Sequence, residues 1–213
     1  TLANNTVWVR LKAGRAIGNY NGETIGISGG SGNGSASVTV SGNVTNATIT
    51  STQNGDWYSG STWAGGIVPG STDNVIINHD VFATASVTRD NGTTTTVNAI
   101  HKLRMENDYV NNGTTTINGI FELGPNGYAA GNNFFSYAAT GSTLIFNTGG
   151  GNYGITAGQK FWPTANYPEN VMVSTGMNID INENVKTIPA SGTMTLFGGM
   201  INTSGINING TLV

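Results

Sequence analysis

The stretch Asn91-Gly92-Thr93-Thr94-Thr95-Thr96-Val97 joins a turn signal to a run that mixes hydroxylated and apolar residues. Asn-Gly and Ser-Gly pairs favour tight turns, whereas Thr and β-branched apolar residues favour strands. The phrase therefore predicts a turn feeding a short strand with one apolar face. It returns, closely or loosely, at four further places: Asn112–Ile117, Thr140–Ile145, Ser191–Leu196 and Asn209–Val213.

The spacing of this phrase indicates how the strands are arranged. Gly92 and Gly113 lie 21 positions apart, and Gly192 and Gly210 lie 18 apart. A repeat of roughly 20 residues suits one coil of a parallel β-solenoid, because a lone coil cannot bury its apolar face and must stack on a neighbour. Helical periodicity is almost missing, so the sequence predicts an all-β protein.

The composition excludes several classes of function. Charged residues make up 9% of the chain, against ~25% in ordinary globular domains. The net charge is −3 and the eight Lys and Arg are scattered, which argues against nucleic-acid binding. The absence of Cys excludes disulfides and thiolate chemistry. No apolar run reaches the ~18 residues of a membrane-spanning helix. Both ends read as strands already under way, so we expect a fragment of a larger protein.

Residues 1–44 read differently from the rest of the chain. Three predicted strands, Val7–Lys12, Glu23–Ser28 and Ser37–Val44, are joined by Gly-rich turns, a pattern typical of antiparallel hairpins in a β-sandwich. The stretch that includes Asn19-Tyr20-Asn21-Gly22 and ends at Val44 resembles the closing strands of immunoglobulin-like modules in large secreted proteins of the Bacteroidota. We expect residues 1–44 to be the end of such a sandwich, and residues 45–56 to be a linker and first edge.

A second motif follows at Thr62-Trp63-Ala64-Gly65-Gly66-Ile67-Val68-Pro69-Gly70, with Asp73 just beyond. It resembles the opening of right-handed parallel β-helix regions in the same surface proteins, and the start of G8-type domains. The resemblance implies a right-handed parallel β-helix over residues 57–213, with its N-terminal cap and first coils. A solenoid end would otherwise expose its core, so a cap is required. The residues expected to form it are Trp57, Trp63, Gly65, Gly66, Pro69 and Asp73.

The later strands are expected to point one apolar face inward. The interval from Gly141 to Gly192 is 51 residues, too long for one coil, so we expect a loop excursion within Gly149–Pro168. The predicted inward set is Val75, Ile77, Val97, Leu103, Met105, Val110, Ile117, Leu123, Leu144, Phe146, Val171, Val173, Ile179, Ile181, Met194, Leu196, Ile206, Ile208 and Leu212.

The densest group of charges lies on one predicted strand. Alternation places Lys102, Arg104 and Glu106 on the same outer face. One interpretation is a solvated face with mixed charges, open to water; another makes Lys102 or Arg104 the base of a polysaccharide lyase. A glycosidase would need two facing carboxylates, and no spacing singles out a pair. An enzyme should gather three or more charged residues from adjacent coils in one groove, whereas a stalk should show Thr and Asn ladders there.

No metal or other cofactor is predicted. Asp73, Asn78, His79 and Asp80, or Asp180 with residues 182–184, carry oxygen ligands suited to calcium. Asn and Asp serve more often as turn formers. Two separated His residues make a poor zinc site.

Aromatic residues of the loop excursion form a candidate binding surface. Exposed, they would stack sugar rings or anchor a partner protein; buried, they would plug the loop onto the solenoid. Of the two, burial is favoured. The residues are Tyr153, Phe161, Trp162 and Tyr167.

These observations favour a non-catalytic structural or adhesive segment of a large secreted or cell-surface bacterial protein. Its expected partners are surface glycans, other secreted proteins and the neighbouring domains of the parent protein. The Bacteroidota resemblance implies an extracellular location reached by type IX secretion. The alternatives are a carbohydrate-active β-helix enzyme with its site partly outside this chain, and a carbohydrate- or ice-binding solenoid.

Overall fold

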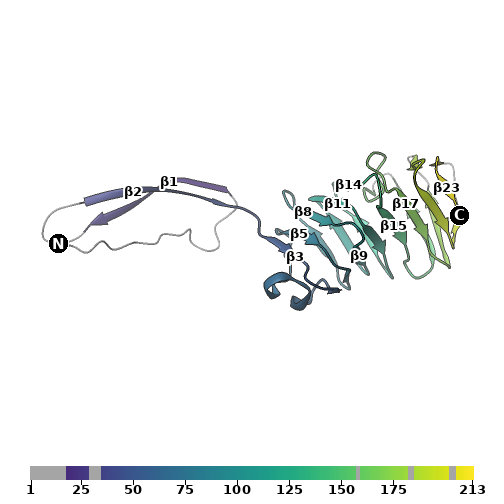
Figure 1. The fold of residues 1–213 in the computed structure, drawn as a ribbon, viewed down its shortest axis with the longest axis horizontal. Helices are drawn as coiled ribbons and strands as arrows, with labels where there is room; N and C mark the ends of the chain where they lie inside the picture. Colours follow the sequence, from purple (N-terminus) through teal and green to yellow (C-terminus); the bar gives the residue numbers. More distant parts are fainter. Residues whose placement is uncertain (1–17, 29–34, 157–158, 182–184, 202–204) are drawn as a thin grey trace. The chain divides into compact units, whose positions relative to one another are not determined.

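The chain divides into two units, Thr1–Asn46 and Ala47–Val213. A computed structural model describes residues 18–28, 35–156, 159–181, 185–201 and 205–213 (Figure 1). Within these residues the protein is built almost entirely from short strands, as the sequence predicts.

The described part of the first unit is an antiparallel hairpin of β1 (Gly18–Ser28) and β2 (Ser35–Val44). The register shifts between Asn21 and Glu23, next to Gly22 with its φ of +87°. The two predicted strands that begin at Glu23 and Ser37 are thus confirmed, and both are longer than expected. The predicted strand Val7–Lys12 lies outside the described residues, and an immunoglobulin-like sandwich over residues 1–44 stays a prediction.

The second unit is a parallel β-solenoid of about seven turns. One eight-stranded sheet runs along the whole solenoid, and we call it the long sheet. Its strands, in spatial order, are β4 (Gly55–Asp56), β6 (Val81–Ala83), β9 (Lys102–Met105), β12 (Ile120–Leu123), β15 (Thr143–Phe146), β17 (Asn170–Val173), β20 (Thr193–Leu196) and β23 (Thr211–Leu212).

The other strands complete the coils in four shorter parallel sheets. A five-stranded sheet holds β3 (Thr48–Thr50), β5 (Asn74–Ile77), β8 (Thr94–Val97), β11 (Thr114–Ile117) and β14 (Phe135–Tyr137). Two three-stranded sheets hold β7 (Val87–Arg89), β10 (Asp108–Asn111) and β13 (Tyr128–Ala130), and then β16 (Gly151–Ile155), β18 (Met177–Ile181) and β21 (Gly199–Met200). A two-stranded sheet pairs β19 (Lys186–Ile188) with β22 (Ile206–Ile208).

The repeated phrase marks corners of the coil, and its strands run parallel as predicted. β8 and β11 pair residue for residue from Thr94↔Thr114 to Ile117↔Val97, and β20 pairs with β23. The copies nevertheless lie in two different sheets, because any corner at which neighbouring coils approach closely needs the same turn. A Cβ on Gly192 would lie 1.9 Å from the Glu169 carbonyl oxygen, which shows why glycine is required there.

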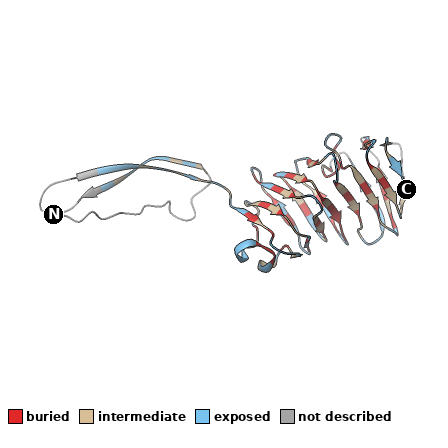
Figure 2. Cartoon of the chain, viewed as in Figure 1, coloured by how far each residue is buried: buried red, intermediate tan, exposed pale blue. Residues whose placement is uncertain are grey.

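The core lies between the sheets and consists of the inward side chains of successive coils (Figure 2). Most of the predicted inward set is buried, but Val110 is half-buried and faces outward. Tyr109 takes the inward position instead, fully buried, with its hydroxyl 2.9 Å from the Thr115 Oγ1. In β10 each of the two sets of alternate residues contains one large apolar side chain, Tyr109 or Val110, so alternation alone does not say which set faces inward. Tyr109 is the inward one because its hydroxyl finds a hydrogen-bond partner there. Near the last coils, Leu196, Ile206 and Ile208 are half-buried and Leu212 is exposed.

Two predicted segments are confirmed only in part. Residues 45–56 were expected to be a linker and first edge; the linker is wrong, because β3 and β4 pair in parallel with β5 and β6, and the first edge is confirmed, because both strands end their sheets. These strands are two and three residues long, too short for a periodic pattern to reveal. The interval from Gly141 to Gly192 spans two coils, because β17 lies between β15 and β20. The expected excursion also contains β16, and the described residues that follow it, 156 and 159–169, belong to no helix or strand.

Candidate functional site

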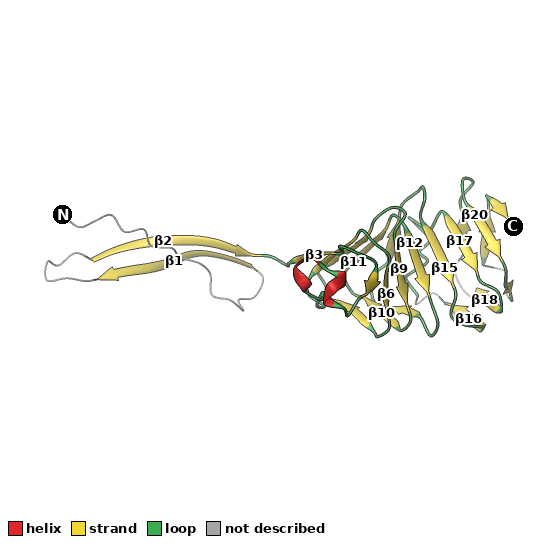
Figure 3. Ribbon diagram, turned by 60° about the horizontal axis from the view of Figure 1, so that its bottom comes forward, coloured by secondary structure: helices red, strands yellow, loops and turns green. Residues whose placement is uncertain are grey.

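The predicted cap forms a compact cluster after β4. Trp57 and Trp63 are 1% and 2% exposed, and their rings meet edge to face with centroids 5.1 Å apart. The Trp63 Nε1 donates a hydrogen bond of 2.6 Å to the Trp57 carbonyl oxygen. Two 3₁₀ turns, Gly60–Thr62 and Ala64–Gly66, carry this segment and lie beside β3 (Figure 3). Trp63 was predicted to be a structural cap at the mouth of the first coil; its burial agrees with that role, and the cap itself stays a prediction.

The remaining predicted cap residues shape the turns around this cluster. Gly65 and Gly66 have φ of +69° and +72°, values that favour glycine. Pro69 is buried, and the Asp73 carboxylate accepts a 2.8 Å hydrogen bond from the Gly70 backbone.

The sequence reasoning missed Arg89, which is 1% exposed and lies 5.8 Å from the Trp57 ring centroid. Its guanidinium donates to the Gly70 and Asp73 carbonyl oxygens. Burial lowers the Arg89 pKa. An arginine at an inward strand position is the only signal that the sequence offers for this contact.

The aromatic residues of the loop are buried, as favoured, and the alternative of an exposed binding surface is wrong. Phe161 and Trp162 are 1% and 0% exposed, Tyr153 is buried, and Tyr167 is half-buried. The three buried rings lie 5.4–6.0 Å from the Phe146 ring in the core. The rings therefore plug the loop onto the solenoid and offer no platform for sugars.

The loop also takes over the pairing of β14. The backbone N–H groups of Phe135 and Tyr137 donate to the carbonyl oxygens of Lys160 and Asn166. Because this pairing draws the loop against the coil, its large side chains turn inward. The Lys186 Nζ donates a 2.6 Å hydrogen bond to the Trp162 carbonyl oxygen. Burial, aided by the charge of Lys160, lowers the pKa of Lys186 to about 8.

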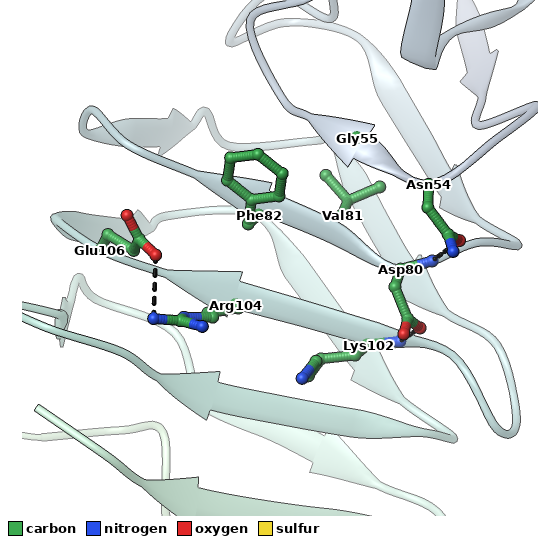
Figure 4. Close-up of a pocket in the computed structure, with 8 residues that line it drawn as sticks. All are labelled: Asn54, Gly55, Asp80, Val81, Phe82, Lys102, Arg104 and Glu106. Carbon is green, nitrogen blue, oxygen red and sulfur yellow. Dashed lines mark hydrogen bonds and ion pairs between the residues drawn. The ribbon is translucent and has the colours of Figure 1, made fainter.

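A groove of about 500 Å³ lies on the outer face of the long sheet. It crosses β4, β6 and β9, so three adjacent coils contribute to it. Figure 4 shows Glu106 and Arg104 together at one end with Phe82 on the strand above them, Asn54 and Asp80 at the other end, and Lys102 between. The lining residues are Asn54, Gly55, Asp80, Val81, Phe82, Lys102, Arg104 and Glu106.

The register of the long sheet explains why these side chains meet. Asp56 pairs with Phe82, Phe82 with Arg104, and Arg104 with Glu122. In a parallel sheet, paired residues point to the same face. A single outward row therefore carries a carboxylate, a ring, a guanidinium and a second carboxylate. The sequence reasoning found Arg104 but missed Phe82; the alternation in Val81-Phe82-Ala83, with Phe82 at the outward position, is the signal that was available.

The basic groups of the groove are paired with carboxylates. The Lys102 Nζ lies 2.9 Å from the Glu122 Oε2, and the Arg104 Nη2 lies 3.0 Å from the Glu106 Oε1. The side chains of Lys102, Arg104 and Glu106 are 31%, 31% and 30% exposed. The face predicted to be open to water is thus partly closed, because neighbouring coils flank each strand.

Glu122 is the buried carboxylate of this ion-pair network and is 4% exposed. Burial, the largest single influence, would raise the pKa of its carboxyl group. The hydrogen bond from Asn147, at 2.9 Å, and the charges of Lys102 and Arg104 together outweigh burial and hold the pKa below its ordinary value. Glu122 is therefore ionised at neutral pH and is unsuited to act as a general acid.

The candidate metal ligands are engaged in other contacts. The Asn78 Oδ1 accepts from Asn98, His79 contacts Ser51, and the Asp80 Oδ1 accepts from the Lys102 backbone. Across the described residues no three His, Cys, Asp or Glu side chains form a group that could hold a metal ion. Asp180 is described, but its proposed partners at 182–184 lie outside the described residues.

The groove meets the condition that was set for an enzyme and lacks the Thr and Asn ladders that were expected there for a stalk. Charged residues from adjacent coils converge in the groove. Side-chain ladders run elsewhere, such as Asn78 to Asn98 and Asn112 to Asn132. Among the described residues no helix is long and apolar enough to cross a membrane. No family model, curated protein or solved structure matches the chain, so its function must be argued from the core and the groove.

Proposed function

We propose that this chain is a non-catalytic structural and adhesive segment of a large secreted or cell-surface bacterial protein. In this role the solenoid is a stiff spacer that holds an outward face in a fixed geometry. A right-handed coil, an immunoglobulin-like sandwich completed by residues 1–44, and export by type IX secretion belong to the same proposal. They rest on the sequence resemblance to Bacteroidota surface proteins.

The observation that carries the proposal is the pairing of charges in the groove. A lyase needs a base that is free to take a proton, and a glycosidase needs an acid that holds one at working pH. Lys102 and Arg104 are each ion-paired with a carboxylate, and Glu122 is held ionised. The groove therefore supports binding better than proton transfer.

The core supports the mechanical part of the proposal. Inward side chains of successive coils form one continuous apolar cluster along the second unit. Parallel hydrogen bonds connect each coil to the next. Each coil of such a solenoid contacts only its nearest neighbours. Many similar interfaces in series then make the solenoid resist bending.

A polysaccharide degradation assay tests the proposal. We expect no cleavage of acidic or neutral polysaccharides, with or without calcium. The assay should include the double variant Lys102→Met, Glu122→Gln, which removes the ion pair as a unit. Removal of Lys102 and Arg104 alone would leave the Glu122 carboxylate buried and unpaired, a change that costs more than the ~0–1 kcal/mol of an exposed pair. Turnover by the wild type that disappears in the double variant, with unchanged melting temperature, would refute the proposal.

The second candidate function is a carbohydrate-active enzyme. It is favoured by the convergence of Asp80, Lys102, Arg104 and Glu106 in one groove across adjacent coils. Cleavage by the wild type in the assay above would promote this candidate.

A further inference from the structure

We propose that the groove over β4, β6 and β9 is a binding site for a neutral oligosaccharide, with the Phe82 ring as its stacking platform. The inference rests on the adhesive part of the proposed function and names the site and the class of ligand.

The groove has the size of a ligand site. Its volume of about 500 Å³ falls within the range of roughly 300–1,000 Å³ that is common for small-molecule pockets. Gly55 lines it without a side chain, and Val81 lines it although it is only 1% exposed. The floor is thus largely backbone, with longer side chains around it (Figure 4). This shape suits a ligand that lies along the floor and makes contacts on several sides.

Phe82 is the feature that points to a sugar. Its side chain faces outward from β6, a strand whose two other residues are buried, and the residue is 39% exposed. A phenyl ring that stays in water within a hydrophobic-in, polar-out sheet adds little to the core. A pyranose ring presents one apolar face of C–H groups and a rim of hydroxyls. The apolar face would cover the Phe82 ring and remove it from water.

The polar groups around Phe82 match the hydroxyl rim. Lys102 and Arg104 supply donors, and Asp80 and Glu106 supply acceptors. The backbone positions are held: the Asn54 Oδ1 accepts from the Asp80 N–H at 2.8 Å, and the Asp80 Oδ1 accepts from the Lys102 N–H at 3.0 Å. Because these residues lie on or next to strands of a rigid sheet, a ligand would order few side chains on binding.

The charge of the groove selects against ionic ligands. The lining holds two cations, Lys102 and Arg104, and two carboxylates, Asp80 and Glu106. Asp56 and Glu122 flank it in the same outward row, which leaves a formal charge of −2. A polyanion would face more negative than positive charge, and both cations are already paired. An uncharged ligand with many hydroxyls can bond to both kinds of group without breaking the pairs.

The experiment is a binding titration on the whole chain with defined probes. Cellohexaose, xylohexaose, laminarihexaose and mannohexaose serve as neutral ligands, and hexagalacturonate as the anionic one. We expect at least one neutral probe to bind with an affinity that hardly changes between low and high salt, because no ion pair forms. Phe82→Ala should weaken that binding at least about tenfold, the loss that corresponds to one stacked ring.

Phe134→Ala is the matched control. Phe134 is 56% exposed and lies away from the groove, stacked under the Lys160 ammonium at 4.5 Å. This variant should bind as the wild type does, and both variants should keep the wild-type melting temperature because both rings are exposed.

Three results would overturn the inference: no binding of any neutral probe, binding that Phe134→Ala abolishes and Phe82→Ala leaves intact, or preferential salt-sensitive binding of hexagalacturonate. Failure of the sugar-binding inference can be distinguished from failure of the proposed non-catalytic function. Absence of binding together with absence of cleavage leaves the structural role standing. Cleavage of a bound probe contradicts the non-catalytic role and retains the groove as the sugar site.

Discussion

Two aromatic clusters in the solenoid were expected to serve different purposes, and both are buried. Trp57 and Trp63, after β4, were expected to be a buried cap; Phe161 and Trp162, in the loop before β17, were a candidate binding surface. All four side chains are at most 2% exposed. The clusters differ in how their polar atoms are treated. The Trp63 N–H reaches the Trp57 carbonyl oxygen, whereas no described residue accepts from the buried Trp162 N–H.

The first cluster is held in place by its own turns, whereas the second is held in place by the pairing of its loop with a strand. The first cluster follows a dense motif of glycine, proline and aspartate that fixes each turn and places each polar group. The second lies in a stretch that is buried because its backbone completes the pairing of β14. An aromatic-rich insertion into a solenoid is thus a poor guide to a binding surface, since the edge of the coil can recruit it.

The largest expected effect is that of Trp63→Ala. The variant removes a buried ring and its edge-to-face contact, and it opens a cavity beside Trp57. We expect a loss of about 3–5 kcal/mol in the free energy of unfolding, measured by denaturant titration. Ile67→Ala, in the same segment but 56% exposed, is the control and should change stability by no more than about 0.5 kcal/mol. Wild-type stability for Trp63→Ala would remove this residue from the cap.

Two milder variants test whether the hydrogen bond of the indole N–H is what distinguishes the two clusters. Trp63→Phe deletes a satisfied N–H and leaves the Trp57 carbonyl oxygen without its donor. Trp162→Phe deletes an N–H that is already unsatisfied and so removes a desolvation penalty of about 1–3 kcal/mol. Both lose similar volume, so Trp162→Phe should be less destabilising by about 1–2 kcal/mol. Equal losses in parallel unfolding curves would show that the hydrogen bond is not what distinguishes the clusters.

The loop cluster should also respond to alkaline pH through Lys186. Its pKa is about 8 in the folded protein, against an ordinary 10.5. Between these values the unfolded chain holds a proton that the folded chain has released, so stability should rise with pH. From pH 8 to 9.5 we expect a gain of about 1–2 kcal/mol in the free energy of unfolding. Lys186→Met should show no such rise, and a flat wild-type profile would contradict the assignment.

The smallest expected effect concerns the ladder that borders the first coils. The Asn98 Nδ2 donates a 2.5 Å hydrogen bond to the Asn78 Oδ1, in a partly buried position. Asn98→Ala should cost about 1 kcal/mol by thermal or chemical unfolding. Asn132→Ala, which breaks a similar but exposed bond to Asn112, should cost less. The reverse order would mean that burial does not set the strength of these Asn–Asn hydrogen bonds.

Much of the architecture could be predicted because it depends on local patterns. Gly-Thr phrases at a spacing of about 20 residues predict stacked coils, and strand alternation predicts most of the core. Failures occurred where the pattern was short or ambiguous. β3 and β4 are too short to show a period, and β10 offered both Tyr109 and Val110 as inward residues.

The groove was only half visible in the sequence. Lys102, Arg104 and Glu106 stand out as a charged strand, but Phe82 and Asp80 come from the coil before, and Glu122 from the coil after. Their meeting depends on the register between strands about 20 residues apart. No single strand carries that information, because corner lengths differ from coil to coil and shift the alignment.

What the sequence determined by itself is the repeating unit: short strands with one apolar face, glycine at crowded corners and a buried tryptophan pair near the first coils. These follow from backbone sterics and hydrophobic burial, which act over a few residues. Only the tertiary structure decided which side chains share the outer row of the long sheet, and that the loop rings lie inside. Both outcomes depend on how one coil sits on the next, since hydrogen bonds between coils set the register and an open strand edge captures whatever segment can pair with it.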